Sequence, residues 1–154
     1  MTIKKRQIRN LGDIVKIDLE DGFHAYARVL EEAMFAFYDC RTKEDLGIEQ
    51  VAAAPVLFQI AVMDHAVKRG RWPVVGHLPL DSKLAAPPPR FIQDVNRPDS
   101  FSIYQHGIIH PATKEECRGL ERAAVWDPTH VEDRLRDHYA GRKNKWFESM
   151  RIKE

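Results

Sequence analysis

The sequence predicts an α+β fold: a strongly bent, mainly antiparallel sheet or partial barrel comes first, and a C-terminal helix caps it. Three observations lead to this prediction. Polar and apolar residues alternate after Gly12, short apolar segments follow one another to about residue 107, and a helical apolar repeat appears after Pro128. The chain has 154 residues, 44% of them hydrophobic, which is enough to bury a core. We expect a single domain over residues 1–154, strand-rich from about 10 to 107 and helical from about 111 to 150.

The first three strands are expected to lie close together along the chain. Residues 15–19, Val-Lys-Ile-Asp-Leu, have the period of two that is typical of a half-buried strand. Residues 20–22, Glu-Asp-Gly, favour a hairpin turn because glycine tolerates the positive φ that tight turns require. The returning strand is predicted over about 23–30 and a third over about 34–39. Short connections between them indicate an antiparallel meander.

The middle of the chain is less regular. Residues 56–63 are almost entirely apolar, which favours a fully buried central strand. Residues 72–80 contain two prolines, which suit an edge strand because proline has no backbone N–H to donate. Two short strands are predicted over 91–95 and 101–106. Residues 85–89, Ala-Ala-Pro-Pro-Pro, are predicted to form a loop, since consecutive prolines favour an extended conformation.

Helix signals dominate the last part of the chain. Residues 120–126 are predicted to form a final short strand. Thr129 and Glu132 have capping-box spacing, so we expect them to begin a helix that Gly141 ends. Glu132 and Arg136 are expected to form an exposed pair at i, i+4. Apolar residues recur every fourth position along this helix, at Val131, Leu135 and Tyr139.

Composition favours a cytoplasmic protein without a membrane segment. Residues 1–10 are rich in lysine and arginine but lack the apolar core of a secretory signal. No apolar run approaches the roughly 20 residues that span a bilayer. Cys40 and Cys117 are expected to be buried free thiols, with a single bridge between them as the alternative. The net charge of +1 disfavours a dedicated nucleic-acid binder, which usually carries a basic excess.

No residue pattern predicts a cofactor, a metal site or catalysis. His106 and His110 flank a Gly-Ile-Ile turn, and this spacing matches no zinc-ligand pattern. Cys117 lies in a short helix begun by a capping box of Thr113 and Glu116, where the helix dipole lowers a thiol pKa. No motif for nucleophilic catalysis surrounds it, and no phosphate-binding or dinucleotide-binding loop occurs. We expect no enzyme activity, and ordinary structural roles for these side chains.

Two basic segments each include a tryptophan, at residues 68–72 and 142–146. Such segments can bind phosphates and stack on bases, but arginine and tryptophan are also enriched where proteins bind each other. A third interpretation is solvated charge beside a tryptophan that anchors its loop to the core. The residues expected to contact a partner protein are Arg71, Trp72, Arg134 and Arg136.

Several motifs together resemble the immunity protein 26 family, over roughly residues 10–110. The Trp72 region, with Pro73, Gly76 and Leu78, is similar to a middle motif of that family. Residues 89–93, a proline followed by a stretch that begins with phenylalanine, are similar to a further segment of it. One departure is Ala27, where the family pattern has glycine. The opening motifs are residues 12–17 (Gly-Asp-Ile-Val-Lys-Ile), 21–22 (Asp-Gly), 25–30 (Ala-Tyr-Ala-Arg-Val-Leu) and 35–39 (Phe-Ala-Phe-Tyr-Asp).

The resemblance implies an immunity protein that binds and neutralises a cognate polymorphic toxin domain by stoichiometric inhibition. Such a role requires no catalytic residue and no cofactor, in agreement with the absence of catalytic motifs. It requires a surface complementary to the toxin. The alternative function is a nucleic-acid-binding module built on a small β-barrel.

Overall fold

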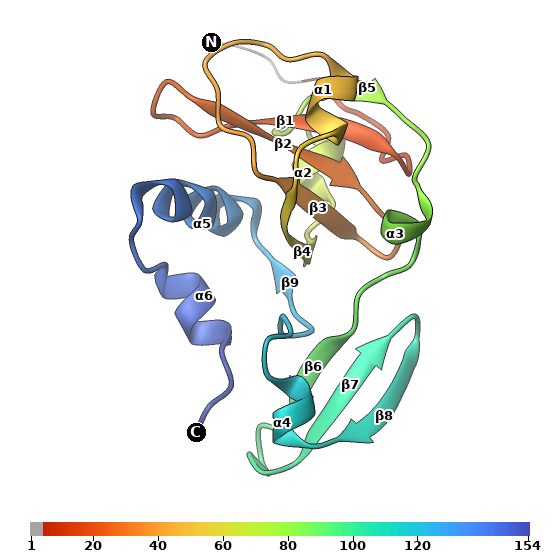
Figure 1. Cartoon of the computed structure of the whole chain (residues 1–154), viewed down its shortest axis with the longest axis vertical. Coiled ribbons are helices and arrows are strands. Elements are labelled where there is room, and N and C mark those ends of the chain that lie inside the picture. The colour runs from red at the N-terminus through yellow and green to blue at the C-terminus, as the bar shows by residue number, and fades with distance from the viewer. Residues whose placement is uncertain (1–4) are drawn as a thin grey trace.

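The computed structural model describes residues 5–154 and contains two sheets with helices around them (Figure 1). The larger sheet has six strands in the order β5-β1-β2-β3-β4-β9, and the smaller has three in the order β6-β7-β8. Every neighbouring pair is antiparallel except β4 and β9. The large sheet stays open because its end strands, β5 and β9, do not pair, so the predicted α+β class is confirmed without a closed barrel.

The elements follow the chain in this order: β1 (Asp13–Asp18), β2 (His24–Val29), β3 (Met34–Tyr38), α1 (Ile48–Ala52), β4 (Val56–Val62), α2 (His65–Lys68), β5 (Val74–His77), α3 (Ser82–Ala85), β6 (Arg90–Gln93), β7 (Phe101–Gln105), β8 (Ile108–Ala112), α4 (Lys114–Cys117), β9 (Val125–Trp126), α5 (Pro128–Ala140) and α6 (Lys145–Met150). No helix among residues 5–154 is long and apolar enough to cross a membrane.

The predicted meander is confirmed in β1, β2 and β3, and β5 is the predicted edge strand. Both faces of this sheet are covered. On the first face, Val15, Phe35 and Phe37 pack against Trp72 and against Val131 of α5. The second face carries two smaller apolar clusters. Since each strand alternates its side chains between these two faces, β2 and β3 are buried along their whole length.

The prediction of a fully buried strand over 56–63 is correct in part. β4 forms there, but only Ile60, Ala61 and Val62 are buried, and Val56 is exposed. The first half of β4 lies where the sheet is left open by the two-residue β9, which pairs only with Ala61 and Val62. The predicted strand over 120–126 is therefore real but much shorter than expected.

The small sheet extends beyond the expected end of the strands near residue 107. β8 follows β7 through a two-residue turn of His106 and Gly107, both with positive φ (51° and 79°). Positive φ at both positions is the geometry that joins tightly paired antiparallel strands. Phe91, Phe101 and Ile103 of this sheet pack on Cys117 in a separate apolar cluster.

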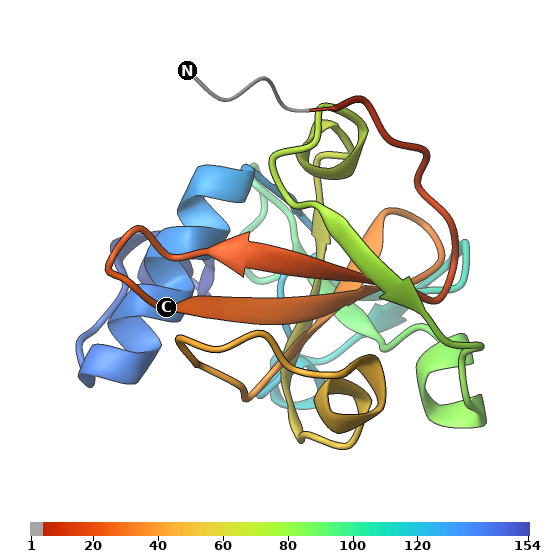
Figure 2. The ribbon, with the colours of Figure 1, turned by 90° about the horizontal axis from the view of Figure 1, so that it is seen from above.

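Helix α5 lies beside the β1–β2 turn, at the opposite end of these strands from α3 (Figure 2). Its beginning differs from the prediction. The cap is Asp127, whose carboxylate accepts the backbone N–H of Thr129, and Pro128 occupies the first turn. The interpretation of Thr129 and Glu132 as a capping box is wrong, whereas Gly141 ends the helix with a φ of 70° as expected. The capping box of α4 is confirmed.

Candidate functional site

The four residues expected to contact a partner all contact α5 or belong to it. Glu132 of α5 is 3% exposed and holds two of them. Arg71 donates to both of its carboxylate oxygens, at 2.8 and 2.6 Å, and the Trp72 indole donates to Oε2 at 2.9 Å. The expected pair of Glu132 with Arg136 is therefore wrong, because a loop 60 residues earlier binds this carboxylate.

Trp72 is fully buried, in agreement with the interpretation of a tryptophan that anchors its loop to the core. Its ring meets the rings of Phe35 and Phe37 edge-on, with centroids 5.5 and 5.7 Å apart. Its only hydrogen-bonding group is the indole N–H, which is satisfied by Glu132. Trp72 acts from inside the core by fixing the loop that carries Arg71.

Arg134 is a cross-link between layers rather than an exposed cation. Its side chain is 11% exposed and binds both carboxylate oxygens of Glu121, at 3.0 and 2.7 Å. Its guanidinium lies 3.7 Å from the ring centroid of Phe58 in β4 and 4.5 Å from that of Phe147 in α6. A paired cation between aromatic rings is well stabilised, and it ties α5 to both elements.

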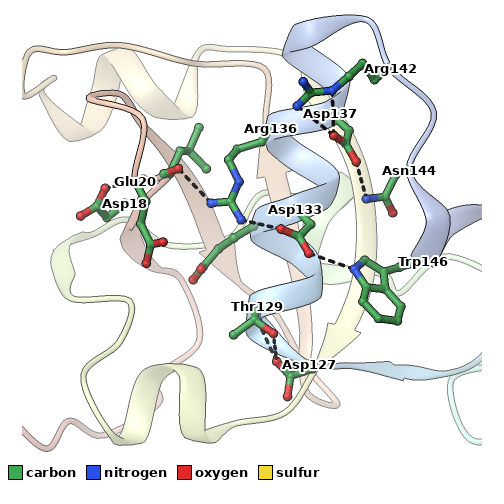
Figure 3. Close-up of polar contacts among 12 residues, drawn as sticks. Asp18, Glu20, Asp127, Thr129, Asp133, Arg136, Asp137, Arg142, Asn144 and Trp146 are labelled. Carbon is green, nitrogen blue, oxygen red and sulfur yellow. Dashed lines mark hydrogen bonds and ion pairs between the residues drawn. The ribbon is translucent and has the colours of Figure 1, made fainter.

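Arg136 connects α5 to the β1–β2 turn. It donates to the backbone oxygen of Leu19 at 2.9 Å and to Asp133 at 2.5 Å. Figure 3 shows Arg136 between that turn and Asp133, whose other oxygen accepts the Trp146 indole N–H at 3.0 Å. The Trp146 ring in turn stacks on His130 at 3.5 Å. This chain of contacts holds the turn, α5 and α6 in one arrangement.

We call the accessible part of this region the α5 face, and define it as the side chains of Asp18, Glu20, Asp133, Arg136 and Asp137 (Figure 3). Four carboxylates and one guanidinium give it a negative excess. Partial burial acts to raise the pKa of Asp133, but hydrogen bonds from Trp146 and Arg136 outweigh it and hold that pKa below its usual value. The carboxylate is therefore charged at neutral pH.

The sequence analysis found Arg136 but missed the acidic members of the α5 face. Asp18 and Glu20 belong to the turn 18–22, and Asp133 and Asp137 lie one helical turn apart on α5. Nothing local marks the turn residues as neighbours of the helix residues, because their proximity depends on the contact of Arg136 with Leu19. The helical spacing of Asp133 and Asp137 was the only available signal.

The histidine and cysteine candidates do not form a site. His106 and His110 are exposed on the β7–β8 hairpin, whereas Cys117 is fully buried against Ser102. Burial raises the pKa of the Cys117 thiol, contrary to the expected effect of the helix dipole. No group of three or more potential ligands lies together within residues 5–154. Both cysteines are free, as expected, although Cys40 is only partly buried.

The basic segments with tryptophans do not present rings for stacking on bases. Trp72 is buried, and Trp146 is already stacked on His130. Arg71 and Arg142 are paired with acidic residues of α5. The sheet is open rather than a closed barrel, and neither of these two tryptophan rings is free to stack on a base.

The structure is that of an α+β protein in which Glu132, Asp133, Arg134 and Asp137 of α5 each form an ion pair. The family model described as Immunity protein 26 matches residues 10–102, more than half of the chain. The chain therefore belongs to the immunity protein 26 family, and the family name identifies an immunity protein of a toxin system. No curated protein and no solved structure matches it. The matched segment begins before β1 and ends within β7, so α5 lies outside it.

Proposed function

We propose that this protein acts in the cytoplasm by binding a cognate toxin domain in a stoichiometric complex that blocks the toxin, without catalysis. Membership of the immunity protein 26 family carries this proposal. A rigid charged face supports it, because an inhibitor that works by occlusion needs complementary shape and charge rather than a reactive group.

We further propose that the α5 face contacts the toxin. Its negative excess suits a partner with a basic surface. Hydrogen bonds and ion pairs fix Asp133, Arg136 and Asp137 before binding, which lowers the entropic cost of association. Arg136 of this face and Arg71 beside it have side chains that are 26% and 33% exposed. The helix members of this face, Asp133, Arg136 and Asp137, lie outside the family-matched segment. Such a position suits partner discrimination, since immunity proteins for different toxins need different contacts.

Co-expression with the toxin domain encoded beside this gene tests the proposed function. We expect the full chain to restore growth and to elute with the toxin as a complex of fixed stoichiometry, measured by size-exclusion chromatography with light scattering. Unrestored growth together with separate elution would contradict stoichiometric neutralisation.

The contact surface is tested by Glu20→Lys, which reverses an exposed charge whose carboxylate makes no hydrogen bond or ion pair with residues 5–154. We expect the association rate at low salt to fall about tenfold, because rim charges act mainly on encounter. Glu49→Lys on α1 is the matched control and should leave the rate unchanged. Equal effects of the two variants would remove the α5 face from the interface.

A further inference from the structure

A hollow of about 530 Å³ opens on the second face of the large sheet, away from α5. It lies between the apolar cluster around Leu84 and the one around Val51. Strands β2, β3 and β4 supply polar side chains to it, Arg28, Tyr38 and Gln59. Its volume is in the range of small-molecule sites.

The register of the sheet brings two polar side chains of the hollow to the same face. Arg28 of β2 lies opposite Ala36 of β3, and Ala36 lies opposite Gln59 of β4. Residues directly opposite on neighbouring strands share a face. Arg28 and Gln59 therefore lie in one row, on either side of the buried Ala36, and both line the hollow.

Arg28 is a buried cation without a counter-charge. It is 4% exposed, and its guanidinium donates to the backbone oxygens of Gly12 (2.8 Å), Leu78 (2.5 Å) and Pro79 (2.9 Å) and to the Tyr38 hydroxyl (3.0 Å). All four acceptors are neutral. Within residues 5–154 no carboxylate lies within 4 Å of this guanidinium. Burial of a charge is costly unless an opposite charge approaches it.

Arg28 and two polar groups beside it have hydrogen-bonding capacity that is not used within residues 5–154. A guanidinium has five N–H groups, and Arg28 uses four of them. The Tyr38 hydroxyl accepts from Arg28, and its own hydrogen has no acceptor within residues 5–154. The Gln59 side-chain oxygen is buried there without a partner. Because the two ends of an amide can exchange places, Gln59 can present its NH₂ group instead.

The other residues that line the hollow add a cation and apolar walls around the polar side chains at its floor. Lys83 adds a second cation, while one Asp81 oxygen is occupied in accepting the N–H groups of Lys83 and Leu84. The apolar wall residues are Ala52, Ala54, Val56, Leu78 and Leu84. A ligand that fits both parts has an anionic end and an apolar body.

We propose that this hollow binds a carboxylate attached to an apolar body, with the carboxylate accepting hydrogen bonds from Arg28, Tyr38 and Gln59. The group can belong to a free carboxylic acid or to an acidic residue or carboxyl terminus of the toxin. A carboxylate supplies the charge that Arg28 lacks and the acceptor that Tyr38 lacks. Recognition of a free acid does not depend on the proposed function.

Free hexanoate and its uncharged analogue hexanamide are the probes for the full-length protein, with binding followed by ¹H–¹⁵N NMR titration. We expect hexanoate to bind at least tenfold more tightly and to shift the amides of β2, β3 and β4. Tyr38→Phe should weaken hexanoate binding about tenfold, because a hydrogen bond to a charged group contributes about 1.5 kcal/mol or more.

Gln59→Glu is the decisive variant. It places a carboxylate of the protein itself in the same row as Arg28, where it would compete with the carboxylate of a ligand. We expect it to reduce hexanoate binding at least tenfold. Gln50→Glu on the exposed side of α1 adds the same charge and should leave binding unchanged. Hexanoate binding that both variants leave intact would overturn the assignment to this hollow.

The purified toxin complex forms the second arm of the test. If Gln59→Glu weakens that complex at least tenfold and hexanoate competes with the toxin, the carboxylate belongs to the toxin. If hexanoate binds and the complex is unaffected, the ligand is a free acid. No binding of hexanoate and no effect of Gln59→Glu on the complex would refute the proposal, even where the toxin is neutralised.

Discussion

The arginines around α5 and Arg28 in the sheet differ in what satisfies their charge. Arg71, Arg134, Arg136 and Arg142 each pair with a carboxylate. Arg28 is more deeply buried than any of these four arginines, yet all its hydrogen-bond acceptors are neutral. Paired charges fix one part of the molecule to another, whereas an unpaired buried charge leaves capacity for a ligand.

The two regions also differ in their relation to the family. Arg28, Tyr38, Gln59 and the α3 residues of the hollow lie within the matched segment 10–102, while α5 follows it. We interpret the hollow as part of the scaffold that the family model describes. The α5 face, whose helix residues follow that segment, is the proposed contact with the toxin. Predictions on stability separate the two roles.

Glu132→Ala should have the largest effect, a loss of about 3 kcal/mol in the free energy of unfolding. The substitution leaves the buried Trp72 indole N–H without an acceptor and Arg71 without its counter-charge, and breaking such a buried pair is strongly destabilising. Urea denaturation measures the loss. Glu49→Ala, at an exposed position, is the control, and a similar small loss in both would show that the pairing around α5 contributes little.

Gln59→Glu should act in the opposite direction and stabilise the fold by about 1.5 kcal/mol at neutral pH. The new carboxylate gains charge-assisted bonds from Arg28, less the cost of its own burial. Its pKa in the folded state would lie below the unfolded value near 4.3, so the added stability is present above that pH and is lost as the pH falls. Urea denaturation at pH 7 and pH 3.5 tests both statements.

An unchanged or lower stability of Gln59→Glu at pH 7 would mean that Arg28 is fully satisfied by its neutral acceptors. The two regions would then differ only in whether their arginines have charged or neutral partners, and Arg28 would have no unused hydrogen-bonding capacity. Gln50→Glu controls for the change in net charge.

The sequence predicted local features well and long-range pairing poorly. The β1–β3 meander and the end of α5 depend on turns and periodicity within a few residues. Glu132 was misassigned because its spacing from Thr129 fits a capping box, while Asp127 caps the helix and Arg71 binds Glu132. No local pattern reveals a partner 61 residues away.

The candidate site shows the same limit. The four residues expected to contact a partner lie around one helix, and their contact with a partner stays a prediction. A tryptophan in sequence gives no sign of whether it is buried, and Trp72 is. Arg28 was visible only as part of a strand motif, because the absence of a nearby carboxylate is a property of the folded chain. Helices α1 and α2 have five and four residues, too short for a periodic signal.

Asp127→Ala should cost about 1 kcal/mol, the usual value of a helix N-cap. This loss measures how much stability α5 gains from its own N-cap rather than from its ion pairs with other elements. A hydrogen bond from Thr129 is the main cause that lowers the pKa of Asp127. Its contribution is therefore complete above the unfolded pKa near 3.9 and is lost as the pH falls further. Thermal unfolding of both proteins at pH 7 and pH 3 should show the difference shrinking at the lower pH.

Arg142→Ala should have the smallest effect, below about 0.5 kcal/mol, although Arg142 makes an ion pair with Asp137 much as Arg71 does with Glu132. The Arg142 side chain is 67% exposed, and water and salt screen such a pair. Urea denaturation at low and high salt should show the small loss vanish at high salt. A loss as large as that of Glu132→Ala would mean that pairing itself, and not burial, determines stability around α5. The contrast with Arg28 would then rest on its missing carboxylate alone.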